Sequence, residues 1–140
     1  MSIELHIFVN DERVPDRDTW QREIERLAFP SVLDPTMNAP ADTGFVPGTF
    51  RGRVAGFEFY LSPAVDVLSS HAHIKPQVGG RNACATFRWG GNLDECGSAI
   101  CAAAALATIA DGVYFYPDDD ILLSAEDAVG AVRGDLGSIP

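Results

Sequence analysis

The chain has 140 residues, 46% of them hydrophobic and 21% charged, a composition typical of one globular domain and not of a disordered or fibrous segment. Its 20 acidic residues against 10 Lys and Arg give a formal net charge of −10 at pH 7. Because nucleic acids and anionic membranes attract positively charged proteins, this balance argues against both as partners and favours a cationic partner.

The start of the chain does not resemble a secretory signal. The first ten residues lack a basic stretch, and apolar and polar side chains alternate over 3–9, as in a half-buried strand. The longest apolar stretch, residues 99–110, is shorter than a membrane span. The number of cysteines, three, is odd, so we expect reduced thiols and a cytoplasmic protein.

Hydrophobic periodicity predicts an amphipathic helix after this first strand. Trp20, Ile24 and Leu27 recur at helical spacing, with Asp18 as the expected N-cap and Pro30 as the stop. The next stretch, 30–48, holds four prolines and two glycines, which predicts a long irregular loop that covers or binds.

A hairpin is predicted over 49–61, with its turn at Ala55-Gly56, and this register places Arg53 opposite Glu58. Residues 62–69 predict a short helix opened by proline, and a second loop follows it.

The second half of the chain contains clearer signals. Alternation over 83–89 predicts a strand, and Asn92 caps a helix over 93–110 that is apolar nearly all round and therefore central. A hairpin over 113–123 and a last helix capped by Ser124 complete the chain. Together these elements predict one α+β domain over 1–140, with a mainly antiparallel sheet and helices packed chiefly on one face.

Two histidines and three cysteines are candidate metal ligands: His71, His73, Cys84, Cys96 and Cys101. On one helix, however, Cys96 and Cys101 lie about 140° apart around the axis and do not easily ligate one ion. We therefore expect no metal. No cofactor is expected either, because the two glycine pairs of the chain lack the spacing of phosphate-binding loops.

An enzymatic alternative is nucleophilic catalysis by Cys96. The first turn of a helix lowers the pKa of a thiol, and His71 or His73 would act as the base. Asp94 and Glu95 beside the thiol oppose its ionisation, so an enzyme is the less favoured class.

Acidic residues concentrate near the C-terminus, where residues 92–140 hold nine of them and one basic residue. The run at 118–120 lacks the spacing of a calcium loop and is expected at an exposed hairpin tip. Aromatic side chains nearby, among them Tyr114, are candidate anchors beside such a surface. The predicted partner-binding residues are Asp94, Glu95, Asp118, Asp119, Asp120, Trp89 and Tyr116.

The stretch Ala-Thr-Phe-Arg-Trp-Gly-Gly (85–91), the Leu93-Asp94-Glu95 helix start with its alanine-rich continuation, and Asp-Gly-Val-Tyr-Phe-Tyr-Pro-Asp (111–118) resemble small bacterial immunity proteins of polymorphic and type VI secretion toxin systems. The resemblance covers about 49–136. It implies an α+β cytoplasmic binding module that neutralises a cognate toxin, which the charge predicts to be basic. The residues are also compatible with a small-molecule pocket under the 30–48 loop, or with an interaction or oligomerisation domain, for example a homodimer.

Overall fold

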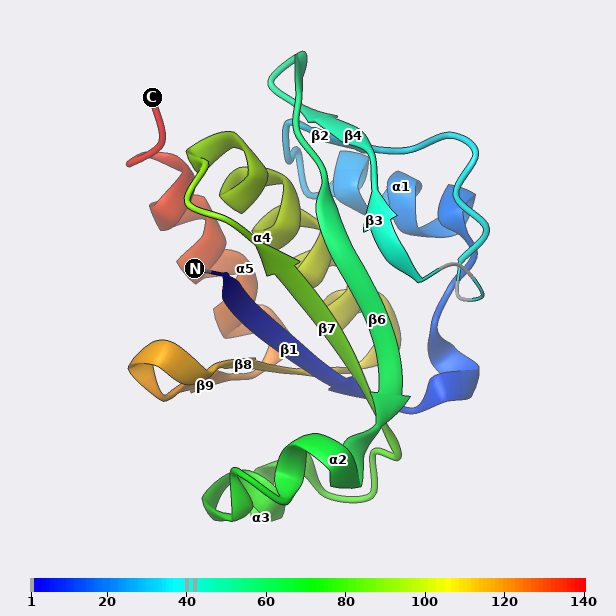
Figure 1. Cartoon of the computed structure of the whole chain (residues 1–140), viewed down its shortest axis with the longest axis vertical. Helices are drawn as coiled ribbons and strands as arrows, with labels where there is room; N and C mark the ends of the chain where they lie inside the picture. The colour runs from blue at the N-terminus through cyan, green and yellow to red at the C-terminus, as the bar shows by residue number, and fades with distance from the viewer. Residues whose placement is uncertain (1, 40, 42) are drawn as a thin grey trace.

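An antiparallel sheet of six strands, in the order β3-β6-β7-β1-β8-β9, forms the middle layer of the molecule (Figure 1). The computed structural model describes residues 2–39, 41 and 43–140. The strands are β1 (Ile3–Val9), β3 (Gly44–Val46), β6 (Phe57–Pro63), β7 (Ala83–Trp89), β8 (Val113–Tyr116) and β9 (Ile121–Leu123). A second, three-stranded sheet consists of β2 (Ser31–Leu33), β4 (Gly48–Phe50) and β5 (Arg53–Val54).

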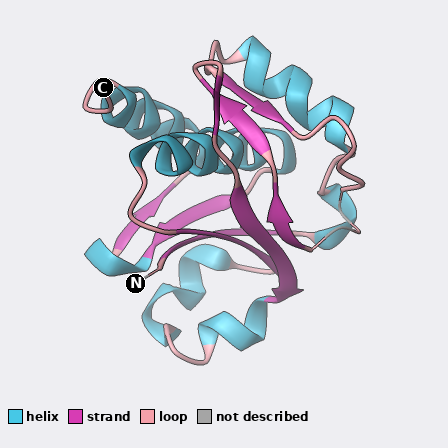
Figure 2. Cartoon of the chain, turned by 45° about the horizontal axis from the view of Figure 1, so that its top comes forward, coloured by secondary structure: helices cyan, strands magenta, loops and turns pink. Residues whose placement is uncertain are grey.

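The helices cover the two faces of the large sheet unequally, which confirms the predicted α+β architecture (Figure 2). The three longer ones, α1 (Arg17–Arg26), α4 (Leu93–Ala110) and α5 (Ala125–Leu136), lie on one face. The opposite face carries α2 (Ala64–Leu68) and α3 (Lys75–Val78). Short 3-10 turns occupy Asp11–Arg13, Ala72–Ile74 and Pro117–Asp119.

Strand alternation divides the core between these two faces. Along β1, Leu5 and Ile7 join the main core under α4, whereas Phe8 joins a smaller cluster under α2 and α3. The same alternation along β8 sends Tyr114 to the main core and Phe115 to the smaller one. Each strand therefore presents two chemically separate surfaces.

Helix α4 is the central element that the apolar sequence predicts. The side chain of Asn92 caps it by accepting hydrogen bonds from the backbone amides of Asp94 (2.8 Å) and Glu95 (3.1 Å). Among the described residues it is the one helix long and apolar enough to cross a membrane, and 67% of that stretch is buried inside the protein, as in the core helix of a globular domain.

Helix α1 docks on α4 through Trp20. The Trp20 side chain is fully buried, and its indole N–H donates a 2.9 Å hydrogen bond to the carbonyl of Ala102. The rings of Phe59 and Phe87 meet it edge-on. The N-cap differs from the expectation: Asp16, not Asp18, accepts a 2.8 Å hydrogen bond from the amide of Thr19, so the helix begins earlier.

The prediction of one irregular loop over 30–48 is wrong at both ends, because this stretch contains β2 and β3. The buried side chain of Gln21 stabilises β2 by hydrogen-bonding to its backbone. Its amide donates to the carbonyl of Ser31 (3.1 Å) and accepts from the amide of Leu33 (2.8 Å), so a helix side chain satisfies one edge of this strand. Pro40 and Asp42, within the same stretch, lie outside the described residues.

The predicted hairpin over 49–61 is also wrong. The turn is at Arg51-Gly52, where both residues have positive φ (52° and 77°), and it joins β4 to β5. Strand β6 pairs with β3 and β7 instead, so Arg53 does not lie opposite Glu58. Two positive-φ residues in succession suit a tight hairpin turn, and this geometry decides the pairing.

Candidate binding cavity

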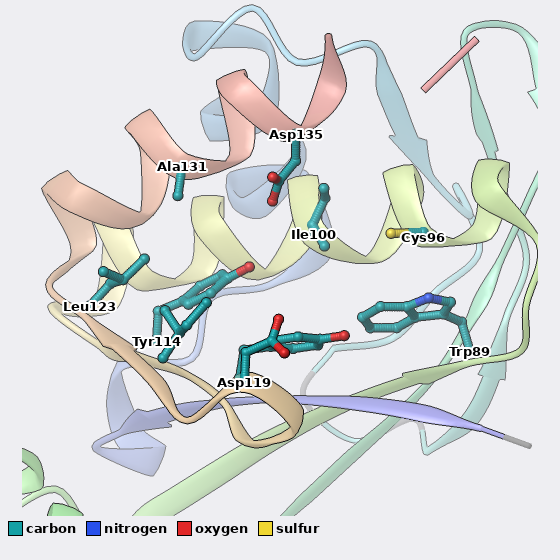
Figure 3. Close-up of a pocket in the computed structure, with 10 residues that line it drawn as sticks. Trp89, Cys96, Ile100, Tyr114, Asp119, Leu123, Ala131 and Asp135 are labelled. Carbon is teal, nitrogen blue, oxygen red and sulfur yellow. The ribbon is translucent and has the colours of Figure 1, made fainter. Parts of the chain in front are cut away.

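A cavity of about 320 Å³ opens between the β8–β9 hairpin, α4 and α5, at the end of β7 (Figure 3). We call it the hairpin cavity. Its wall is mainly apolar and aromatic, with two carboxylates. The lining residues are Trp89, Cys96, Ile100, Tyr114, Tyr116, Asp119, Ile121, Leu123, Ala131 and Asp135.

The aromatic part of the wall follows from strand alternation. Tyr114 and Tyr116 are two residues apart on β8, so both face α4 and α5, and Trp89 occupies the end of β7. Tyr114 and Trp89 are each only 5% exposed. Figure 3 shows the Tyr114 hydroxyl directed into the cavity, and no described residue hydrogen-bonds to it. The Tyr114 oxygen is not among the fully enclosed polar atoms that lack a partner, so it is accessible from the cavity and free to hydrogen-bond to water or to a ligand atom there.

The polar part of the wall is negatively charged. Figure 3 shows the Asp119 carboxylate entering from the hairpin and the Asp135 carboxylate from α5. Asp118, next to Asp119, lies close enough to Tyr116 to act on its ionisation. Among the described residues that line the cavity, none is basic. The site therefore combines uncompensated negative charge with aromatic surface.

The pKa values of the titratable groups in the cavity wall are raised, because these groups are partly buried and no positive charge lies beside them. Desolvation raises the pKa of the Asp135 carboxyl above its ordinary value. Burial, followed by the charges of Asp118 and Asp119, raises the pKa of Tyr116. Burial raises the pKa of the Cys96 thiol, and the charge of Asp135 adds to this, so the thiol is not activated as a nucleophile.

The structure brings three of the seven predicted partner-binding residues into the cavity wall: Trp89, Tyr116 and Asp119. The predicted residue Asp118 is beside them on the hairpin tip. Asp135 is a lining residue that the sequence reasoning missed. A signal was present in the sequence, because Ala131 and Asp135 are four residues apart and share a helix face, but only the packing of α5 against the hairpin turns this face to the cavity.

Two of the other predicted acidic residues, Asp94 and Asp120, contact basic side chains, and Glu95 does not line the cavity, so the seven do not form one uncompensated patch. Arg53 donates two hydrogen bonds, of 2.7 and 2.9 Å, to the carboxylate of Asp94, and this contact lowers the pKa of Asp94. Asp120 lies 2.7 Å from the imidazole of His73. Glu95 occupies the first turn of α4, where its backbone amide is capped by Asn92.

The pair needed for the enzymatic alternative is not formed. Cys96 packs with the main core under α4, whereas His71 and His73 lie against Phe115, on the opposite face of the sheet. The sheet itself therefore separates the thiol from both candidate bases. Among the described residues, no group of three or more His, Cys, Asp and Glu side chains is arranged to hold a metal ion.

A third histidine is buried on that opposite face. His6 accepts or donates a 2.9 Å hydrogen bond with the hydroxyl of Thr86 and lies 3.5 Å from the sulfur of Cys84. Desolvation lowers the pKa of His6 to about 4 and raises the pKa of Cys84 to about 12. Both groups are therefore neutral at pH 7 and behave as packed core residues.

In comparisons of this chain with models of protein families, with curated proteins and with solved structures, nothing matches. The residues and geometry of the chain itself therefore carry the functional argument.

Proposed function

We propose that this protein is an immunity-type inhibitor that acts in the bacterial cytoplasm by binding a basic toxin through the hairpin cavity and its acidic rim. The observation that carries the proposal is the pair of carboxylates, Asp119 and Asp135, in an aromatic cavity whose described wall has no basic residue. A partner that inserts positive charge there neutralises both carboxylates.

Two physical arguments support a protein as the partner. The net charge of −10 attracts a basic protein over a distance of about one Debye length, roughly 8 Å at physiological salt, and accelerates encounter. Tyr116 is the partly exposed aromatic side chain of the cavity wall, and tyrosine is one of the residue types that contribute most of the binding energy at interface centres. Charge thus selects the class of partner, and the aromatic wall supplies contact area.

The proposal predicts that a neighbouring gene encodes a basic toxin domain, and co-expression of this protein with that domain tests it. The wild-type protein should restore growth, and the variant Asp119→Lys/Asp135→Lys should not. We expect its affinity for the toxin to fall by at least about a hundredfold, because each reversal places like charges together at the interface.

The matched control is Glu12→Lys/Glu25→Lys, which changes the net charge equally at two exposed residues whose side chains form no ion pair with a described residue. Glu25 lies on α1, far from the β8–β9 hairpin (Figure 1). This variant should still protect cells, with only a slower, salt-dependent association. Equal protection by both double variants would overturn the proposal, as would failure of the wild-type protein to protect.

A further inference from the structure

Resting on the proposed function, we infer that the hairpin cavity receives one arginine side chain of the partner, with the guanidinium between Asp119 and Asp135 and the methylene stem along the aromatic wall. This inference goes beyond the attraction of opposite charges, because it assigns one chemical group to one cavity.

The size and lining of the cavity suit a single long side chain. Its volume of about 320 Å³ lies at the lower end of the range for small-molecule sites. The apolar residues Ile100, Ile121 and Leu123 line it together with the aromatic rings, which suits an alkyl stem. The two carboxylates enter from different elements, the hairpin and α5, so charge is available on two sides of the space (Figure 3).

The unpartnered hydroxyl of Tyr114 is the second, independent observation. Tyr114 is 5% exposed, no described residue hydrogen-bonds to its hydroxyl, and Figure 3 shows that hydroxyl aimed into the cavity. A phenolic oxygen accepts a hydrogen bond, and a guanidinium offers five N–H donors. One guanidinium therefore has enough donors for this hydroxyl and for the carboxylates of Asp119 and Asp135, which line the same cavity.

Arginine fits this combination better than lysine does. A guanidinium is planar, weakly hydrated and stacks on aromatic faces, whereas an ammonium is strongly hydrated and has three donors in a compact group. Arg133 is two residues before Asp135 on α5. Its guanidinium does not enter the cavity wall, because it donates a hydrogen bond to the carbonyl of Leu27 and lies over the ring of Phe29. Since no basic residue is among the described residues that line the cavity, the arginine that we assign to it comes from the partner.

The test is a titration of the full-length protein with N-acetyl-L-arginine amide, followed by amide chemical shifts in NMR. The matched ligand is N-acetyl-L-citrulline amide, which has nearly the same shape and no charge. We expect saturable millimolar binding of the arginine probe, with shifts at the residues that line the cavity. Binding of the citrulline probe should be at least about tenfold weaker, and that of N-acetyl-L-lysine amide weaker than that of the arginine probe.

Variants locate the site. Asp135→Asn, which keeps the side-chain shape, should weaken binding of the arginine probe about tenfold, and Tyr114→Phe should weaken it severalfold. The control Glu25→Gln, at an exposed position on α1, should leave it unchanged. Thermal unfolding of each variant verifies that it is folded.

Equal binding of the arginine and citrulline probes, equal binding of the lysine probe, or an unchanged affinity in Asp135→Asn would overturn the inference. The experiments distinguish failure of the arginine assignment from failure of the proposed inhibitor function. If Asp119→Lys/Asp135→Lys abolishes protection from the toxin while the probes show no preference for arginine, the inhibitor function stands and the arginine assignment fails. If the arginine probe binds selectively but the wild-type protein does not protect, the assignment stands and the inhibitor function fails.

Discussion

Gly97 offers a sharp test of how the two sheets are held together. It lies inside α4, and a Cβ atom placed there would be 2.5 Å from two ring carbons of Phe50 and 2.7 Å from a third. Phe50 belongs to β4 in the small sheet and is fully buried. The missing side chain of Gly97 therefore lets this ring rest directly on the helix backbone.

Gly97→Ala brings two opposing effects. Alanine favours the helix over glycine by about 0.8–1 kcal/mol. Against this, carbon atoms in favourable contact are about 3.5–4 Å apart, so the new methyl group overlaps the Phe50 ring by about 1 Å. Relieving such an overlap in a packed core costs about 1–3 kcal/mol, and the flat, buried ring of Phe50 has little room to move. The difference between these two effects is a net loss of up to about 2 kcal/mol in the free energy of unfolding.

The matched control is Gly130→Ala in α5, where an added Cβ meets nothing within 4 Å. Only the helix preference acts there, so this variant should gain about 0.5–1 kcal/mol. Urea unfolding followed by circular dichroism measures both changes as shifts of the midpoint in opposite directions. If Gly97→Ala is as stable as Gly130→Ala, the close contact with Phe50 does not limit position 97. Gly97→Ala should cost less in a Phe50→Leu background than in the wild-type protein, because the smaller side chain leaves space for the methyl group, although Phe50→Leu itself destabilises the core.

Three further predictions concern other buried groups. Because desolvation lowers the pKa of His6 from 6.5 to about 4, the unfolded chain binds the proton more tightly, and the free energy of unfolding should fall by up to about 3 kcal/mol as the pH drops from 6.5 towards 4. His6→Asn should flatten this part of a stability–pH curve, and an unchanged curve would contradict the assignment. Trp20→Phe removes the hydrogen bond to the carbonyl of Ala102 and leaves a void, so its urea midpoint should correspond to a loss of about 2–3 kcal/mol, whereas a neutral effect would show that the contact is dispensable. A thiol reagent should label Cys96 alone, and slowly, in the native protein, since the other two cysteines are fully buried; mass spectrometry showing three rapid modifications would rule this out.

Local patterns were sufficient for the elements whose causes are local. The strand at 83–89 follows from alternation, and the helix over 93–110 follows from its Asn92 cap and apolar composition. Local patterns did not predict which distant segments of the chain pair with each other. Strand β2 is stabilised by Gln21, which lies on α1, and a pattern of neighbours along the chain does not reveal that a helix side chain will act as its partner.

The same distinction between local and long-range causes applies to the candidate site. The sequence by itself determined that the C-terminal part is acidic and that Trp89, Tyr116 and Asp119 are surface or anchor candidates. Only the tertiary structure decided which charges remain uncompensated, since Arg53 reaches Asp94 across 41 positions of the chain. It also decided that Asp135 shares a cavity with Asp119, because α5 folds back over the hairpin, and charge–charge distances depend on that packing and not on separation along the chain.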